Sequence, residues 1–141
     1  MKNKNYYLFL IIIILFSCSK KLPHNLEIAF IHDSLIYRIQ DKSSGSSVLE
    51  PGDYIGFNDT NPKVERLLTY SINDLGFIVF LKSTNNSNYY VLIKPKPEEE
   101  QIYSETLFDY IIYSENDYKK LNLKDNWHKI PFNSNSLKVK K

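Results

Sequence analysis

The sequence has one cysteine, Cys18, which excludes any disulfide within the chain and any thiolate cluster for a metal. Its three histidines, His24, His32 and His128, lack the close spacing of common metal sites. With four glycines, the chain has no glycine-rich phosphate loop and no G-x-S-x-G nucleophile turn. Its formal net charge of +2 is too small to favour nucleic-acid binding. We therefore expect no metal, no cofactor, no nucleic-acid partner and no enzymatic activity.

Long hydrophobic runs are also scarce, and the longest one lies near the start of the sequence. Residues 8–16 are uninterrupted Leu, Ile and Phe. This is about half of the ~20 residues that a membrane-spanning helix needs. Lys2 and Lys4 precede the run, and a small residue, Ser17, follows it. A positive start, a short apolar stretch and a small residue are together typical of a secretory signal peptide.

The stretch Leu15-Phe16-Ser17-Cys18 resembles a lipobox, the motif that the lipoprotein signal peptidase cuts before a lipidated cysteine. This resemblance to bacterial lipoproteins implies a signal peptide over residues 1–17, cleavage between Ser17 and Cys18, and a lipid anchor on Cys18. Ser19, in place of an aspartate, is similar to an enterobacterial outer-membrane sorting signal. The implied location is the bacterial cell envelope, on the periplasmic face of the outer membrane. The other two interpretations of the run are an uncleaved anchor and a buried core segment.

Removal of residues 1–17 leaves 124 residues, enough for one domain with its own core. Loss of Lys2 and Lys4 with the signal leaves 16 basic residues against 16 acidic ones, so the remaining chain is neutral. We expect three parts in it: a lipidated tether over residues 18–25, a globular domain over 26–135 and a basic tail over 136–141.

The pattern of apolar residues predicts an α+β fold, a small β-rich single domain with a mostly antiparallel sheet and one or two short helices. The expected strands cover residues 26–32, 35–40, 54–57, 77–82, 89–94 and 107–113. Ser114 is expected to cap a short helix over 115–121. A longer helix is expected over 61–76, where apolar residues follow a 3.6-residue period. These residues are Val64, Leu67, Leu68, Ile72 and Leu75.

Residues 35–95 resemble a PDZ domain of the type associated with bacterial proteases. Within residues 48–59, Leu49, Gly52-Asp53 and Ile55 match the family pattern Gly-Leu-x-x-Gly-Asp-x-Ile-x-x-Asn-Gly. The resemblance implies that an extended peptide, often a C-terminus, binds by strand addition beside the expected helix. The peptide-binding residues that it implies are Leu26, Ile28, Val64 and Leu68.

Two further features allow more than one interpretation. Ser34 lies in Asp33-Ser34-Leu35, which is similar to a short O-glycan acceptor motif of secreted Bacteroidetes proteins, although a plain turn between two strands also explains it. The aromatic residues of the second half either pack on the sheet or form a recognition patch. They are Tyr89, Tyr90, Tyr103, Tyr110, Tyr113, Tyr118 and Trp127.

These observations lead us to expect a lipid-anchored, non-catalytic envelope protein that binds a protein or peptide partner. Two alternatives stay open. One is an immunity or inhibitor lipoprotein that blocks a toxin or enzyme in the periplasm, and the other is a structural envelope lipoprotein without a discrete ligand. A small tethered chain without catalytic motifs is compatible with all three, and the sequence does not predict the oligomeric state.

The lipid anchor gives the first prediction. Cys18→Ala removes the sulfur that would carry the diacylglycerol, so we expect it to abolish incorporation of a labelled fatty acid into the protein in growing cells. The control is Ser19→Ala, which leaves the sulfur in place and should be labelled like the wild type. Labelling of the Cys18→Ala protein would contradict the lipobox interpretation.

Overall fold

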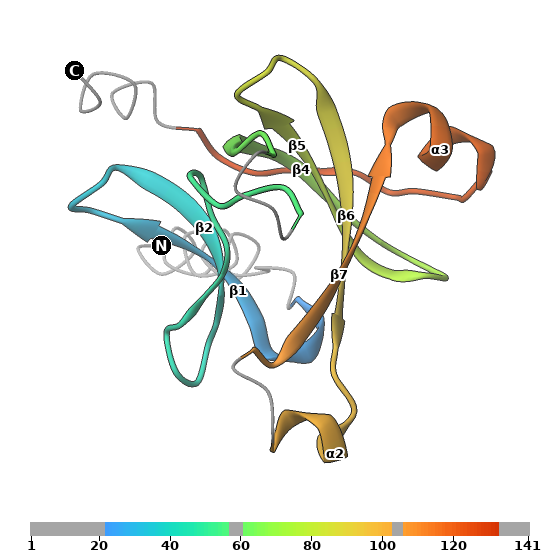
Figure 1. Cartoon of the computed structure of the whole chain (residues 1–141). Coiled ribbons are helices and arrows are strands. Elements are labelled where there is room, and N and C mark those ends of the chain that lie inside the picture. Colours follow the sequence, from blue (N-terminus) through green and yellow to red (C-terminus); the bar gives the residue numbers. More distant parts are fainter. Residues whose placement is uncertain (1–21, 57–60, 103–105, 133–141) are drawn as a thin grey trace, which may run out of the picture.

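Figure 1 shows the computed structural model of the chain, which describes residues 22–56, 61–102 and 106–132. These residues form a β-rich domain of two antiparallel sheets. The smaller sheet has the strand order β1-β2-β3, with β1 over Leu26–Ile31, β2 over Ile36–Asp41 and β3 over Ser47–Leu49. The larger sheet has the order β7-β6-β5-β4-β8. Its strands are β4 (Val64–Asn73), β5 (Gly76–Ser83), β6 (Asn88–Pro95), β7 (Phe108–Ser114) and β8 (His128–Lys129).

The main core lies between the two sheets. Phe77, Val79 and Leu81 alternate along β5 and point toward the three-stranded sheet, where they belong to one buried cluster with Ile39 and Leu49. Each of the three β5 side chains is fully buried. This packing follows from the period of two in a strand, which places every second side chain on the same face.

The opposite face of the large sheet is also covered. Ile78 of β5 and Leu92 of β6 are buried beneath Tyr118 of the helix α3 (Glu115–Lys120). Figure 1 shows α3 beside β7, on the side of the large sheet away from β1 and β2. Because both faces of β5 are buried, its sequence is a continuous apolar run and not an alternation of apolar and polar residues.

Helix α3 confirms the cap that the sequence predicts. The Ser114 side-chain oxygen accepts a hydrogen bond from the Asp117 backbone N–H at 3.1 Å, which is the usual N-cap contact. Acidic residues occupy its first turn and Lys119 and Lys120 its last turn, so the charges complement the helix dipole. Another helix, α2 over Glu98–Gln101, lies within the charged stretch that follows β6.

The packed part of the chain begins before β1. Leu22 and Leu26 are both buried in the main core, on either side of a short 3₁₀ helix, η1, over Pro23–Asn25. Residues 22–25, expected in the tether, therefore belong to the fold. The signal peptide, Ser17, Cys18 and the basic tail over 136–141 lie outside the described residues. Among the described residues, no helix is long and apolar enough to cross a membrane.

The helix predicted over 61–76 is wrong, because this segment forms strand β4. Two register shifts in its pairing with β5 explain the error. Val64 lies opposite Ser83 and Arg66 opposite Lys82, so β4 contains one extra residue, and a second lies between Leu67 and Thr69. These β-bulges change the spacing of the inward side chains from two residues to three. Val64, Leu67 and Tyr70 are all buried, and their spacing imitates a helical period.

The other expected elements are reproduced closely. The strands over 26–32, 35–40, 77–82, 89–94 and 107–113 correspond to β1, β2, β5, β6 and β7. In place of the strand expected over 54–57, Tyr54 makes a single bridge to Lys63, and Phe57 lies outside the described residues. With a strand where the PDZ resemblance implies a helix, the described residues form no groove beside a helix at 61–76.

The bulged strand gives the second prediction. A helix would bury Ile72 and not Tyr70, whereas in the structure Tyr70 is 7% exposed and Ile72 is 47% exposed. We expect Tyr70→Ala to lower the free energy of unfolding by about 3 kcal/mol, as truncation of a buried aromatic residue does. Ile72→Ala should cost less than about 1 kcal/mol, because its side chain is half exposed. Urea denaturation measures both, and a larger loss for Ile72→Ala would contradict the strand.

Candidate functional site

A cavity of about 440 Å³ lies between the two sheets. Its deepest walls are apolar and come from three strands of the large sheet, with Val64 on β4, Leu81 on β5 and Val91 on β6. The polar and more exposed lining residues are Ser47, Glu50, Asp53, Tyr54 and Tyr110. A concave, mostly apolar pocket with a few polar groups at its rim is the usual form of a ligand site.

The cavity is flanked by an edge strand of each sheet. Strand β3 is the last strand of the small sheet and β7 is an outer strand of the large one. Val48 and Leu49 of β3, and Tyr110 and Ile112 of β7, all line the cavity. An edge strand carries backbone N–H and C=O groups that no neighbouring strand pairs. The cavity therefore adjoins the outer edges of two strands, and on β3 the Val48 carbonyl is already bonded to a side chain of β7.

Tyr110 connects these two edges. Its hydroxyl donates a hydrogen bond of 2.7 Å to the backbone carbonyl of Val48, which is 62 residues away in the sequence. The aromatic ring lies in the cavity wall. Burial raises the pKa of Tyr110 to about 12, and the nearby Asp53 carboxylate contributes to this increase. The hydroxyl therefore stays protonated, and remains a donor, throughout the neutral pH range.

Asp53 is held at the rim by the turn Glu50-Pro51-Gly52-Asp53, in which Pro51 and Gly52 are residues that favour turns. Its Oδ2 accepts a hydrogen bond of 2.8 Å from the backbone N–H of Glu50, and its backbone carbonyl accepts one from the N–H of Val64. Gly52 has a φ of +102°, which favours glycine at this point of the turn. Burial raises the pKa of Asp53, the Glu50 N–H opposes that effect, and the Glu50 carboxylate raises it further.

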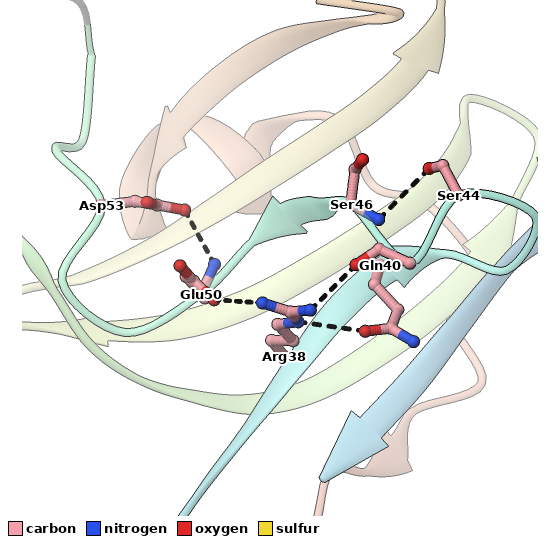
Figure 2. A network of polar contacts seen from close by, with 7 residues as sticks. Arg38, Gln40, Ser44, Ser46, Glu50 and Asp53 are labelled. Atoms are coloured by element: carbon pink, nitrogen blue, oxygen red, sulfur yellow. Dashed lines mark hydrogen bonds and ion pairs between the residues drawn. The ribbon is translucent and has the colours of Figure 1, made fainter. Parts of the chain in front are cut away.

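Glu50 is the second carboxylate of the rim, and an arginine behind it fixes its position. Arg38 Nη1 lies 3.3 Å from Glu50 Oε2, while its Nε donates to Gln40 Oε1 and its Nη2 to the carbonyl of Gly45. Figure 2 shows Arg38 between Glu50 and Gln40, with Asp53 on the other side of Glu50. Because Arg38 is held by three separate acceptors, it orients the Glu50 carboxylate without itself lining the cavity.

The residues implied by the PDZ resemblance do not come together around this cavity. Val64 lines it, whereas Leu26 is buried in the core and Ile28 packs against the same core from β1. Leu68 is the extra residue of the second bulge in β4, and its carbonyl accepts a hydrogen bond from the N–H of Ile130. Ser34 lies half-buried in the turn between β1 and β2.

Most of the aromatic residues of the second half pack on one another. The Tyr90 and Tyr118 rings stack 4.0 Å apart at 7°, and Phe80 and Trp127 lie against Tyr90 at 4.6 and 5.6 Å. We name these four residues the outer aromatic cluster, because they cover the face of the large sheet away from the cavity. Their geometry agrees with packing on the sheet. Tyr103 lies outside the described residues.

The sequence analysis missed Glu50, Asp53 and Tyr110 as a group. The tripeptide Asp-Tyr-Ile occurs at both 53–55 and 109–111, and both copies contribute lining residues. The repeat alone could not identify a site, because three matching residues recur by chance.

No group of His, Cys, Asp and Glu among the described residues is arranged to hold a metal ion. No protein-family model, curated protein or solved structure matches this chain. The chemistry of the cavity is therefore argued from its own residues.

The hydrogen bond of Tyr110 gives the third prediction. Tyr110→Phe leaves the Val48 carbonyl without its donor, so we expect a loss of about 1–2 kcal/mol in the free energy of unfolding at neutral pH. The control is Tyr113→Phe on the same strand, because the Tyr113 hydroxyl has no hydrogen bond to a described residue. Equal losses in the two variants would contradict a specific role for the Tyr110 hydroxyl.

The same variant has a pH signature. The raised pKa means that the folded protein holds the Tyr110 proton more tightly than the unfolded chain does. The resulting stability is fully present below pH 10.0, the ordinary tyrosine value, and is lost as the pH rises toward about 12. The difference in stability between wild type and Tyr110→Phe should therefore shrink across this window, as urea denaturation at a series of pH values can measure.

Proposed function

We propose that this protein is a lipid-anchored, non-catalytic module of the bacterial envelope that binds an extended segment of a protein partner at the cavity between β3 and β7. The observation that carries the proposal is the position of the cavity, an apolar pocket of about 440 Å³ bordered by the edge strands of two sheets. The lipobox ending at Cys18 supports the anchor.

An extended peptide suits this arrangement better than a compact small molecule does. The outer edge of the seven-residue strand β7 offers backbone groups that a peptide in β conformation can pair with, and such pairing supplies affinity that depends little on sequence. A pocket beside the edge then accepts alternate side chains and supplies specificity. The apolar walls of the cavity, Val64, Leu81 and Val91, provide the surface that such a side chain would bury.

The anchor limits where the partner is met. Leu22 is buried in the core, and Cys18 precedes it by four residues. Four extended residues span at most about 14 Å, so a lipid on Cys18 would hold the domain close to the membrane surface. This supports a partner that lies at or near the bilayer, and Ser19 supports the periplasmic face of the outer membrane as its location.

Site-specific photo-crosslinking in growing cells tests the proposal and gives the fourth prediction. A photoreactive amino acid at Tyr54 stands at the rim of the cavity, whereas one at Ile72 stands on β4, which is not an edge strand, and does not line the cavity. The two positions are similarly exposed, at 45% and 47%. We expect one dominant protein crosslinked from position 54 and absent from position 72.

The identity of the captured protein separates the binding roles. A toxin or secreted enzyme would assign the cavity to an inhibitor, and a resident envelope protein would assign it to an assembly or scaffolding role. If positions 54 and 72 give the same products, or none, in a folded protein, the proposed function is wrong and a structural role takes its place.

A further inference from the structure

The side chains that line the cavity carry charge of one sign. Glu50 and Asp53 supply two carboxylates at the rim, and no lysine, arginine or histidine is present among the described lining residues. Arg38 offsets part of the charge of Glu50 from behind, at 3.3 Å. Asp53 has only a neutral partner, the Glu50 backbone N–H, among the described residues. Lys63 also lies at the rim, over the Tyr54 ring, so the negative charge without a cationic partner among the described residues is that of Asp53.

The apolar walls lie below the rim that carries Glu50 and Asp53. Val64, Leu81 and Val91 are almost completely buried, whereas Tyr54 at the rim is 45% exposed. An occupant that matches both levels has an apolar stem and a positive end. Lysine and arginine side chains have this form, since they bury their methylene groups against apolar surface and keep the charged end at a polar boundary.

One aromatic ring adds to the preference for a cation. Tyr110 lines the cavity, and the face of a tyrosine ring attracts a positive charge within about 6 Å. Tyr54 also lines the cavity, but its ring already holds Lys63, with the Nζ 4.6 Å from the ring centre. Tyr110 and Asp53 both line the cavity, and the Asp53 charge contributes to the raised pKa of Tyr110.

We infer that the cavity accepts a basic side chain of the partner segment, with its methylene stem against Val64, Leu81 and Val91 and its positive end between Glu50 and Asp53. This inference rests on the proposed function, because it takes the occupant to be part of a peptide. The burial that raises the pKa of Asp53 is consistent with it, since a bound cation would compensate the cost of a partly buried carboxylate.

Three blocked pentapeptides test this inference and give the fifth prediction. They share the sequence Ala-Val-X-Val-Ala, with lysine, its uncharged analogue norleucine, or glutamate at X. The full chain is held in nanodiscs of zwitterionic phosphatidylcholine, so that the lipid does not attract the lysine peptide, and empty nanodiscs give the background. We expect the lysine peptide to bind at least about tenfold more tightly than the other two, and to weaken as salt rises because its charged end is near the surface.

Carboxylate variants locate the charge that is recognised. Glu50→Gln and Asp53→Asn should each weaken the lysine peptide about three- to tenfold and leave the norleucine peptide unchanged. The amide oxygen of Glu50→Gln can still accept the hydrogen bond from Arg38, and that of Asp53→Asn can still accept the one from the Glu50 N–H. Thermal melts check that both variants fold. The matched control is Glu65→Gln, because Glu65 pairs with Lys82 at 3.2 Å, has the same 29% side-chain exposure as Glu50 and lies outside the cavity.

The outcomes separate this inference from the proposed function. If the norleucine peptide binds as tightly as the lysine peptide, or if Glu65→Gln weakens binding as much as Glu50→Gln, the preference for a basic side chain is wrong while peptide binding stands. If no peptide binds but a partner is still crosslinked from position 54, the inference is again overturned and the proposed function is retained. The absence of both peptide binding and a crosslinked partner would overturn both.

Discussion

Strand β5 is buried on both faces, and the arrangement of the other elements follows from this constraint. One face needs an apolar cover against Phe77, Val79 and Leu81, which the small sheet provides. On the other face, α3 and the outer aromatic cluster cover Ile78. Because three strands cannot cover the whole face of a five-stranded sheet, part of the inner face stays open. The cavity occupies that part, between the edges β3 and β7.

Local patterns predicted the strands and the cap well because each depends on residues that are neighbours in sequence. The apolar runs of β5 and β6, and the contact from Ser114 to Asp117, are of this kind. The segment at 61–76 was mistaken for a helix because its bulges exist only through pairing with β5. A spacing of three fits either a helix or a doubly bulged strand, and the choice between them is made by a partner strand, which the local pattern does not contain.

The cavity shows the same division between local and distant causes. The turn at residues 50–53 was predictable, because Pro51 and Gly52 are strong turn residues. That its two acids line the same cavity as Tyr110 was not predictable, since the contact from Tyr110 to Val48 joins positions 62 residues apart. The PDZ resemblance identified the same turn, but the described fold places strand β4 where that family has its peptide-flanking helix.

The outer aromatic cluster has a consequence for the optical properties of the protein. Trp127 is the only tryptophan in the sequence, and it lies against Tyr90 at 5.6 Å on the face of the large sheet away from the cavity. Its fluorescence therefore reports the packing of α3 on β6, with Tyr90 and Tyr118 close enough to transfer excitation energy to it. The large sheet separates Trp127 from the cavity, so tryptophan emission reports whether the outer layer is intact. A ligand in the cavity would instead change the ultraviolet absorption of Tyr54 and Tyr110, which line it.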